Sequence, residues 1–583
     1  MTDSYYLIAA TFIPLVLAPA AYIFSKKFGP NAVTWFSFGI LAISTTLLLI
    51  PSLNINGYKS AYVESYTWSQ FGNFGLRLDG LSLPFASIIY ILCTVLALYS
   101  KPYMLHKIKE AFHESSNSQG QGQDSHSQNH NPAGQISSGS GTLVISGTKE
   151  EQYVNHHMGL YFGLYLSFSM GMLGTVLATN LIEFYVFFEL MLVPSFFLLA
   201  FYGYGARKRI ALMFFFWTHA GAVILLLGLL AMGFFAGGFD YDTVRANASR
   251  IPAQWLGIII FSLVIGLGVK LAAFMLHIWL PYAHAEAPTP ISALLSPAMI
   301  GIGAYGLLRL WLELLAGDYS QYSIYIYLWG LATMIYGGAM AMMQDDIKKV
   351  LAYSSVSQMG YILFGLGSDS MLGITGGTLM YVSHGLGKAI LFMMAGSIIL
   401  QTGTRKMSEL GGLAGKMPYT AVIAMIGALT IMGIPPTSGF MAEWILFNGV
   451  LQSGVTNSDT LRVVGFGLGI LATVLSSAYI LWMYKRIFFG KLPEKYVNVR
   501  DSNRYITVTM AALAALTLFL GTYPNPILNP LTEYIQGMFA TDSHVLPLPN
   551  TVQAVQVNDT MAVTSFKMSS NITGNAQLLE GEH

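Results

Sequence analysis

Apolar segments of about twenty residues recur along almost the whole chain, and no other feature restricts the fold more strongly. Each segment is long enough to cross the roughly 30 Å of hydrocarbon in a bilayer. Lipid cannot pair with backbone polar groups, so a spanning segment must pair its own, as a helix does. The runs 221–235 and 258–269 also lack the every-second-residue alternation of a membrane β-strand. The sequence therefore predicts an all-α integral membrane protein, in agreement with a charged fraction of only 10%.

The apolar segments predict about fourteen transmembrane helices, the first three of them within 1–100. They lie at 4–25, 32–52, 79–100, 157–178, 180–203, 210–236, 254–282, 287–316, 321–343, 346–367, 371–401, 417–451, 462–489 and 505–522. The seventh and twelfth of these are too long for one simple crossing and contain internal glycine or proline. We expect both to be discontinuous, and interrupted helices mark ion sites in transporters because the break frees backbone groups inside the membrane.

Basic residues gather in alternate loops, which orients the chain because cytoplasmic loops collect lysine and arginine. Of the 29 lysines and arginines, 20 fall on one predicted side, including Lys348, while 6 fall on the other and 3 lie inside predicted helices. Both termini are therefore expected to be extracytoplasmic, in a prokaryotic plasma membrane. The sequons at Asn247, Asn558 and Asn571 fall on the predicted outer side. Surface sequons and a single cysteine would suit an archaeon.

Two polar stretches stand apart from the apolar segments. Residues 101–156 form an insertion rich in His, Ser and Gln, and its part 113–148 lacks the apolar residues that a core needs. We expect a flexible cytoplasmic linker there, with a metal site as the alternative, although no metal-ligand spacing repeats. A helical region at 491–540 precedes an expected extracytoplasmic tail at 541–583. Cys93 lies within an apolar run, so it offers neither a disulfide nor a thiolate metal site.

Four ionisable residues lie deep within predicted helices, where a charge is costly and therefore indicates function. They are Glu189 in the fifth helix, Lys270 in the seventh, Lys388 in the eleventh and Glu443 in the twelfth. Burial disfavours the charged form of an amine, whereas a nearby carboxylate favours it. We expect Glu189 to tune Lys270 so that the amine can hold or release a proton. Lys388 would pass the proton along and Glu443 would gate its exit; two buried structural ion pairs are the alternative.

Three histidines are candidates for a relay beside these groups. His384 shares a helix face with Lys388, four residues later, and His277 and His284 follow Lys270. Neutral imidazole can hand protons between waters near physiological pH, although a lone helix histidine is more often a hydrogen-bonded structural group. Two further charges are expected to have no such role. Glu183 is expected to be interfacial, and Arg309 is expected to snorkel to the membrane surface.

Four strings stand out along the chain: LDGLSLPF at 78–85, HIWLP at 277–281, APTPISAL at 287–294 and DIKKVLAYSS at 346–355. Together they resemble the motifs of one family, the antiporter-like subunits of complex I type quinone oxidoreductases. Glu189, followed by Leu-Met-Leu-Val-Pro, is similar to the fifth-helix glutamate of that family. The resemblance covers about 79–490 without the insertion. It favours subunit M, because subunit L usually has lysine at the position of Glu443.

The resemblance implies fourteen helices with two inverted five-helix repeats, at 157–316 and 317–490. It also implies proton translocation driven by quinone reduction elsewhere in a complex, with NADH or another electron donor. No flavin, iron–sulfur or nucleotide motif is visible in the sequence. Flavin, iron–sulfur clusters and quinone are therefore expected in partner subunits, and no redox centre or metal in this chain. The expected partners are antiporter-like and quinone-module subunits of the membrane arm and the lipid bilayer, without nucleic acid.

The chain departs from the pattern of the family at three positions. The family commonly has lysine in the eighth helix where this chain has Gly301, and often histidine in the tenth where it has Gln358. Lys388 is more typical of subunit L and of cation antiporter relatives. Three alternatives remain open: a subunit of a multi-subunit cation/proton antiporter, a subunit of an energy-converting membrane hydrogenase, and a proton-inert scaffold. The missing lysine at Gly301 is the feature that supports the scaffold.

Overall fold

The computed structural model of the chain describes residues 5–55, 60–68, 72–121, 141–539 and 545–547, with the backbone alone for 115–121 and 141–148. Contacts divide the chain into Met1–Pro547 and Leu548–His583. The second unit lies outside the described residues, and with it most of the predicted tail and two of the three sequons. The described residues therefore belong to the first unit, which contains every predicted site residue.

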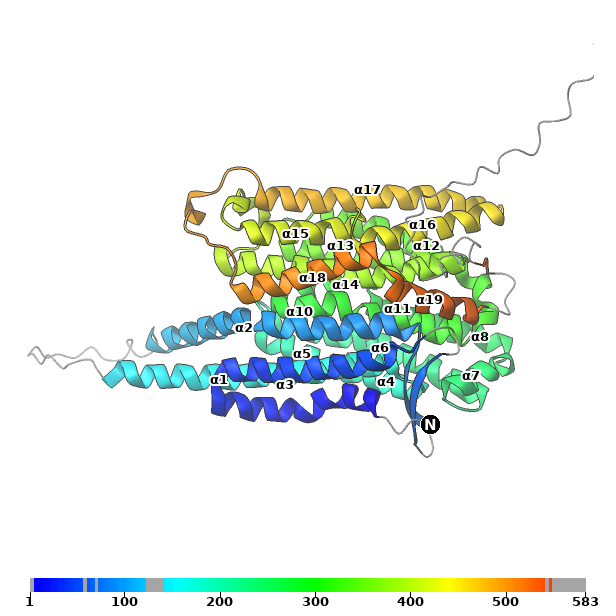
Figure 1. Ribbon diagram of the computed structural model, residues 1–583, viewed down its shortest axis with the longest axis horizontal. Coiled ribbons are helices and arrows are strands. Elements are labelled where there is room, and N and C mark those ends of the chain that lie inside the picture. The colour runs from blue at the N-terminus through cyan, green and yellow to red at the C-terminus, as the bar shows by residue number, and fades with distance from the viewer. Residues whose placement is uncertain (1–4, 56–59, 69–71, 122–140, 540–544, 548–583) are drawn as a thin grey trace, which may run out of the picture. The chain divides into compact units, whose positions relative to one another are not determined.

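Helices form nearly all of the described structure (Figure 1). The α-helices are α1 Tyr6–Ser52, α2 Ser82–Gln121, α3 Gly141–Leu177, α4 Leu181–Leu190, α5 Leu192–Tyr202, α6 Arg207–Ala236, α7 Tyr241–Ala246, α8 Ala253–Leu271, α9 Trp279–Glu286, α10 Thr289–Leu294, α11 Gly301–Gly306, α12 Tyr319–Met342, α13 Ile347–Leu366, α14 Met371–Thr402, α15 Pro418–Ile431, α16 Ser438–Thr456, α17 Thr460–Phe488, α18 Arg504–Thr522 and α19 Asn525–Met538. Short 3₁₀ turns lie at Ala248–Arg250, Ala316–Asp318, Met407–Glu409, Leu413–Gly415 and Glu494–Tyr496.

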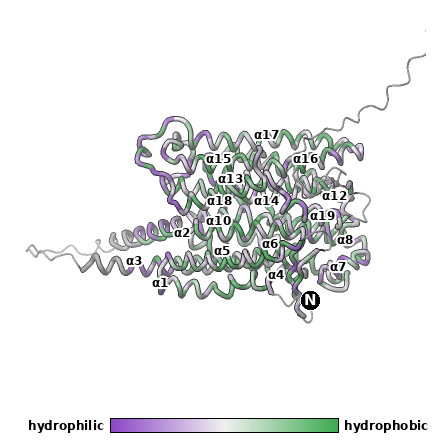
Figure 2. The backbone as a smooth tube through the Cα atoms, in the orientation of Figure 1, coloured by the Kyte–Doolittle hydropathy of each residue, from purple (hydrophilic) through white to green (hydrophobic). Residues whose placement is uncertain are grey.

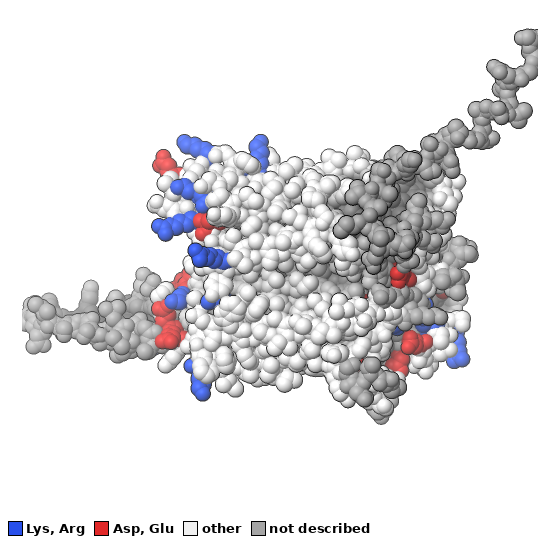
Figure 3. Space-filling view, viewed as in Figure 1, with Lys and Arg blue, Asp and Glu red and all other residues white. Residues whose placement is uncertain are grey.

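Apolar residues fill the length of the helices, and polar residues collect at their ends (Figure 2). Charged side chains likewise gather at two ends of the visible face, with an uncharged belt between them (Figure 3). Among the described helices, 11 are long and apolar enough to cross a membrane. The all-α, multi-pass membrane class is therefore confirmed. The total of about fourteen spans and the two inverted repeats stay predictions.

Helix α1 folds back on itself, in agreement with the two separate spans predicted at 4–25 and 32–52. Gly29 interrupts α1 with φ of 81°, a left-handed value that glycine adopts without strain. The rings of Phe24 and Phe36 lie 4.7 Å apart between centroids, although twelve helical residues would separate them by about 18 Å. The two halves of α1 therefore lie against each other, as Figure 1 shows in dark blue.

Both predicted interruptions are confirmed. The seventh segment stops at Leu271 and resumes as α9 at Trp279, and Ala272 and Met275 between them have positive φ values of 58° and 71°. The twelfth segment stops at Ile431 and resumes as α16 at Ser438. The eighth segment contains two irregularities that the sequence did not predict. They are the π-helical stretches Leu295–Met299 and Leu307–Glu313, on either side of α11.

The prediction of a loop at 101–156 is wrong for much of its length. Helix α2 continues to Gln121 and α3 begins at Gly141, so the apolar span is only part of each helix. Lys109 and Glu150 form an ion pair of 3.2 Å, and the rings of Phe112 and Tyr153 lie 5.4 Å apart, so the two extensions pair with each other. Hydropathy shows where the residues of a helix change from apolar to polar, but the helix itself can continue beyond that point. Residues 122–140 lie outside the described residues.

Two further elements are not among the predicted spans. A hairpin of β1 (Tyr62–Thr67) and β2 (Asn73–Leu78) pairs antiparallel, with Tyr62 opposite Leu78. Helix α19 is only 14 residues long and contains Pro530, so it falls below the length of a span. Its buried residues Leu531, Tyr534, Ile535 and Met538 lie on one face and pack it against the protein.

The core consists of α14 and the segment 289–313, which are buried almost throughout. Helix α14 packs against α13, α15 and α16 on one side and against α2 and α10 on another. By contrast α1, α6 and α17 expose most of their apolar side chains, as lipid-facing helices do. His384 and Lys388 on α14 are therefore buried within the protein.

Candidate proton-transfer site

Lys270 lies in the last turn of α8, directly before the interruption. Its side chain is buried, with 1% of the residue exposed, and its Nζ has no hydrogen-bond partner in the described part of the chain. The nearest aromatic ring is that of Phe188, whose centroid is 4.7 Å from Nζ. The C-terminal end of a helix and an aromatic face both favour a positive charge. Lys270 is thus placed where its amine can carry a proton without a fixed partner.

Glu189 lies near the end of α4, one residue after Phe188. Its charge acts on Lys270, as the sequence predicts, but its direct partner is a different residue. The Oε2 atom of Glu189 is 3.0 Å from Nδ1 of His219 on α6, and Oε1 has no partner among the described residues. His219 was not among the site residues predicted from the sequence. The same rule that selected the other buried charges would have found it, because it lies within a predicted span.

The interruption between α8 and α9 is held by hydrogen bonds from its neighbours. The indole of Trp279 donates to the carbonyl oxygen of Val269 at 2.8 Å, which closes the end of α8. The backbone N–H of Phe274 donates to the hydroxyl of Thr333 on α12 at 3.2 Å. His277 is buried in the break, where its Nε2 lies 3.2 Å from the hydroxyl of Tyr336. The break is therefore a built feature, and His277 is part of it.

Lys388 is buried at the centre of α14 and contacts α13. Its Nζ donates to the hydroxyl of Ser354 and to the carbonyl oxygen of Leu351, at 3.3 Å from the latter. One turn earlier, both ring nitrogens of His384 are buried without a hydrogen-bond partner in the part that the structure describes. The charge of Lys388 acts on His384. The predicted pairing of these two residues on one helix face is confirmed.

His284 joins the two halves of the site. It is fully buried on α9, its ring lies 5.2 Å from that of Phe392 on α14, and neither ring nitrogen has a partner among the described residues. The charges of Lys388 and Lys348 act on His284. Lys348 is also completely buried, although its position in the sequence suggested a solvent-facing basic loop. It is the second functional candidate that the sequence analysis missed.

Glu443 lies in the second turn of α16, directly after the interruption of the twelfth segment. It is buried, and its carboxylate lies against the backbone of Gly433, where an added Cβ would be 2.4 Å from Oε2. Its Oε1 has no partner in the described structure, while its charge acts on the hydroxyls of Tyr361 and Tyr479. The predicted placement of Glu443 at a helix break is confirmed.

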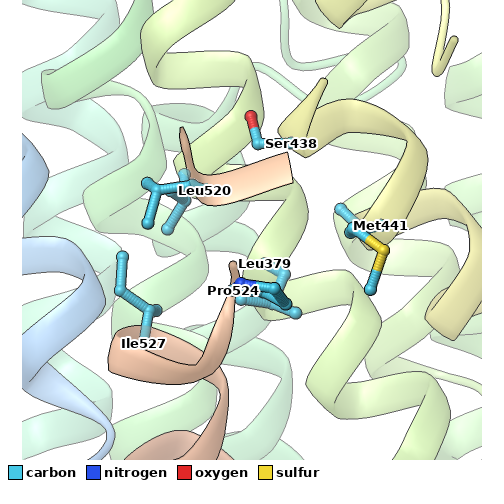
Figure 4. A pocket seen from close by; sticks show the side chains of 8 residues that line it. Leu379, Ser438, Met441, Leu520, Pro524 and Ile527 are labelled. Atoms are coloured by element: carbon cyan, nitrogen blue, oxygen red, sulfur yellow. The ribbon is translucent and has the colours of Figure 1, made fainter. Parts of the chain in front are cut away.

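A small cavity adjoins the start of α16 (Figure 4). Its volume is about 20 Å³, enough for one water molecule, and the hydroxyl of Ser438 is its polar group. Its lining comes from four helices: Leu379, Val382, Ser438, Met441, Ala442, Leu520, Pro524 and Ile527. The cavity lies beside Ala442, the residue before Glu443, so a water here would be next to the break rather than far from it.

The alternative of two buried structural ion pairs is wrong. Neither Lys270 nor Lys388 takes part in any ion pair between described residues, and Glu443 pairs with no cation there. The four predicted residues are also not joined to one another by direct hydrogen bonds in the described structure. A proton that travels between them must therefore use water or the intervening histidines and hydroxyls.

The position of the missing eighth-helix lysine is filled by an aromatic ring. A Cβ at Gly301 would lie 2.0 Å from Cε2 of Tyr381 on α14. The Tyr381 ring stacks on Phe85 at 4.3 Å between centroids, and its buried hydroxyl has no partner among the described side chains. Near the same helix, the hydroxyls of Ser296 and Ser355 share a hydrogen bond of 2.7 Å. The Tyr381 ring thus occupies the space that a side chain at Gly301 would need.

Two expectations about the other charges are wrong. Arg309 does not snorkel: it is buried and donates to both oxygens of Asp79, at 2.8 and 2.9 Å, and to Glu313 at 2.6 Å. Burial alone would raise the pKa of Asp79, but Arg309 and Arg77 beside it lower that pKa to about 2. Glu183 is buried rather than interfacial. It accepts from the backbone N–H of Gly75 at 3.2 Å and so fixes β2 to α4.

Comparisons with known proteins agree with this arrangement. The profile of the family described as NADH:quinone oxidoreductase/Mrp antiporter, transmembrane, matches residues 178–469, which include every predicted site residue. The F(420)H(2) dehydrogenase subunit M of Methanosarcina mazei is 36% identical over 530 residues, which are 88% of this chain and 95% of that protein. The NADH-quinone oxidoreductase subunit M of Rickettsia typhi is 33% identical over 358 residues, 61% of this chain and 71% of that protein.

Solved structures show the same fold. A chain of respiratory complex I from Thermus thermophilus superimposes with a TM-score of 0.72 at 22% sequence identity, over 91% of this chain and 99% of that one. At this identity the likeness concerns the fold alone.

Proposed function

The chain belongs to the family of membrane subunits that NADH:quinone oxidoreductases share with Mrp antiporters, and from this premise we propose that it conducts protons as an antiporter-like subunit of a complex I type oxidoreductase. Its relatives include subunit M of NADH-quinone oxidoreductase and of F(420)H(2) dehydrogenase. The electron donor of this chain's own complex would be NADH or another reduced carrier. Flavin, iron–sulfur clusters and quinone would be held by partner subunits of the same complex.

One observation carries this proposal: the Nζ of Lys270 is buried at the end of an interrupted helix without a fixed partner among the described residues. A buried amine with a permanent ion pair has no reason to change its protonation state. A buried amine without a permanent ion pair can be protonated or neutral, and its distance to a carboxylate decides which form is favoured. Glu189 is that carboxylate, because its charge acts on Lys270 while its hydrogen bond is to His219.

The remaining groups would carry the proton onward. Lys388 and His384 lie on the same face of α14, and His284 lies within reach of the charge of Lys388. Glu443, beside the second interruption, would release the proton on the opposite side. Movement of a proton from Lys270 to Lys388 breaks an N–H bond at one amine and forms one at the other, with His277, Ser355 or water between them. The completed transfer leaves the summed charge of the two amines unchanged.

The orientation follows from the basic loops. The end of the molecule that is rich in lysine and arginine would face the cytoplasm, and both termini would lie outside. The membrane would be the plasma membrane of a prokaryote, for which an archaeal relative gives support. Protons would then move from the basic end toward the end that carries Asp79 and Arg309.

The test is replacement of the central pair in the intact complex. We expect Lys270→Ala and Glu189→Gln each to abolish most proton pumping into reconstituted vesicles, while quinone reduction in the presence of an uncoupler is retained. The exposed Lys26, on the basic end, provides the control Lys26→Ala, which should pump like the wild type. Unchanged pumping in both site variants would support the proton-inert scaffold instead.

A cation/proton antiporter is the second candidate, because the matching family includes Mrp antiporters and Lys388 is typical of them. Copurification separates the two functions: partners that carry iron–sulfur clusters indicate an oxidoreductase, and further antiporter subunits alone indicate an antiporter. Partners that carry nickel and iron would indicate a hydrogenase. A sodium gradient that drives proton movement without an electron donor would also support the antiporter.

A further inference from the structure

Two cavities open at the basic end of the molecule, where charged side chains gather (Figure 3). One, here named the vestibule, has a volume of about 580 Å³ and is lined by Tyr204, Glu286, Gln344, Asp346, Lys348 and Arg405, among others. The second, of about 730 Å³, shares Tyr204 and Gly205 with it and lies toward α2. Both volumes are large enough for many water molecules. The C-terminal ends of α9 and α14 and the N-terminal end of α13 are therefore accessible to bulk water from this side of the molecule.

Lys348 forms the inner wall of the vestibule. Although it lines the cavity, its side chain is fully buried, and its Nζ donates to the carbonyl oxygens of Ala287 at 2.5 Å and Ala285 at 3.3 Å. These carbonyls are at the C-terminal end of α9, where a positive charge is favoured. Asp346 fixes the start of α13 by accepting from the backbone N–H of Lys348 at 2.9 Å. The amine is thus held between the water-filled cavity and the protein interior.

Charged groups of both signs surround the opening: the acidic Glu286, Asp345 and Asp346 and the basic Lys348, Lys349, Arg405 and Lys406. Arg405 donates to Asp346 at 2.7 Å and to the carbonyl oxygen of Ala285 at 2.6 Å, and its Nη2 is 3.5 Å from Oε1 of Glu286. The other oxygen of Glu286, Oε2, is buried and has no partner among the described residues. Arg405 therefore pairs with Asp346 and fixes the C-terminal end of α9, whereas Oε2 of Glu286 keeps an unused acceptor site in the wall of the vestibule.

A line of groups leads inward from Lys348. His284 lies three residues before Ala287 on α9, and the charges of both Lys348 and Lys388 act on it. On α13, Leu351 lies three residues after Lys348 and Ser354 lies three residues after Leu351, so successive members of this series are neighbours on the helix surface. Both of them bind the amine of Lys388. Lys388 is thus bound to the helix that begins at Lys348, and His284 is within range of the charges of both lysines.

We propose that the vestibule is the mouth through which protons are taken up, with Glu286 as the collecting carboxylate and Lys348 as the first buried carrier. This inference rests on the proposed function. A hydronium ion in the vestibule protonates the carboxylate of Glu286 and becomes water. Glu286 then gives this proton through water to the unprotonated amine of Lys348, which leaves a carboxylate and an ammonium group. The ammonium then gives a proton to a ring nitrogen of His284, which passes one on toward Lys388, so each N–H bond that breaks is matched by one that forms.

The opposing view is that Lys348 only caps the end of α9. Replacement of Lys348 by arginine distinguishes a helix cap from a proton carrier. The guanidinium keeps the positive charge and the hydrogen-bond donors but does not release a proton. In the intact reconstituted complex, we expect Lys348→Arg and Lys348→Met both to pump about tenfold more slowly or worse. Pumping by Lys348→Arg at the wild-type rate would overturn the inference, because a helix cap is then sufficient. Lys270→Ala, run beside them, tests the proposed function separately: if it pumps normally, that function fails whatever Lys348 does.

A second experiment does not depend on changing Lys348. The only cysteine, Cys93, is buried, so a new one can be labelled selectively within this subunit. Gln344→Cys places a thiol in the vestibule, and Asn498→Cys places one on the exposed loop after α17, at the same basic end. A membrane-impermeant, positively charged thiol reagent should reduce pumping several-fold in the first variant and leave the second and the wild-type complex unaffected. Equal pumping by the labelled Gln344→Cys and Asn498→Cys complexes would overturn the proposal.

Discussion

Glu189 is hydrogen-bonded to His219, with 3.0 Å between Oε2 and Nδ1, although the charge that Glu189 acts upon is that of Lys270. His219 lies on α6 and is partly exposed, so it is not a second carrier buried in the core. It fixes one carboxylate oxygen and leaves the other free. The function of this histidine would then be to set the direction of the carboxylate toward Lys270.

This relationship gives the first prediction. We expect His219→Ala to lower proton pumping about tenfold, because a hydrogen bond to a charged group contributes about 1.5–3 kcal/mol. The loss should be smaller than in Glu189→Gln, where the charge itself disappears. His156, a histidine whose Nδ1 lies 2.9 Å from the hydroxyl of Tyr22, provides the matched control His156→Ala. Pumping rates of both variants, measured in vesicles with a pH-sensitive dye, would separate the roles; equal loss in both would exclude an orienting role for His219.

The second prediction concerns Gly301 and Tyr381. A side chain at Gly301 has no room, because Cβ would lie 2.0 Å from the Tyr381 ring. Gly301→Lys should therefore destabilise the subunit and prevent assembly of the complex, whereas Gly301→Lys combined with Tyr381→Ala should assemble. Gly39, a helical glycine with open space around its Cβ position, provides the control Gly39→Ala, which should be neutral. The measurement is the yield of intact complex after purification. Normal assembly of Gly301→Lys alone would contradict the packing.

The third prediction concerns the carboxylate at the second interruption. Gly433 has φ of 65°, and an added Cβ would lie 2.4 Å from Oε2 of Glu443. Gly433→Ala should displace that carboxylate and reduce pumping as strongly as Glu443→Gln does. Gly237→Ala introduces the same backbone strain, of about 1–2 kcal/mol, at φ of 80° but with nothing near its Cβ. If Gly237→Ala impairs pumping to the same degree, strain rather than contact with Glu443 is the cause.

The sequence predicted the parts of the site that depend on position along a helix. A charge inside an apolar segment and a glycine or proline inside an overlong one are local signals, and they placed Lys270 and Glu443 beside the two interruptions. The burial of Lys348 could not be predicted in this way. It depends on α9 ending against the start of α13, a contact between residues more than sixty positions apart.

The charge network around Arg309 illustrates the same limit. A lone arginine near a helix end is usually expected to reach the membrane surface. Here Asp79, from the loop before α2, and Tyr534, from α19, both come to Arg309 from distant parts of the chain. Helix α19 was missed because its pattern has four apolar residues on one face and is too short for a span. A hydropathy pattern does not predict contacts with side chains from such distant elements.

The last prediction concerns the stability that Asp79 gives to this network. Burial alone would raise the pKa of Asp79, yet Arg309 and Arg77 lower it to about 2 from an ordinary value of 3.8. Because the folded pKa lies below the unfolded one, the contribution of Asp79 to stability is complete above about pH 4 and is lost as the pH falls toward 2.

Asp79→Asn leaves Arg309 with an uncompensated charge on that side and should cost about 3–5 kcal/mol of stability at neutral pH. The apparent melting temperature of the detergent-purified complex should therefore fall. Between pH 4 and pH 2 the wild type should lose its advantage over Asp79→Asn, since protonated aspartic acid and asparagine are both neutral. A constant difference between the two melting temperatures over that range would show that the ion pair does not stabilise the fold.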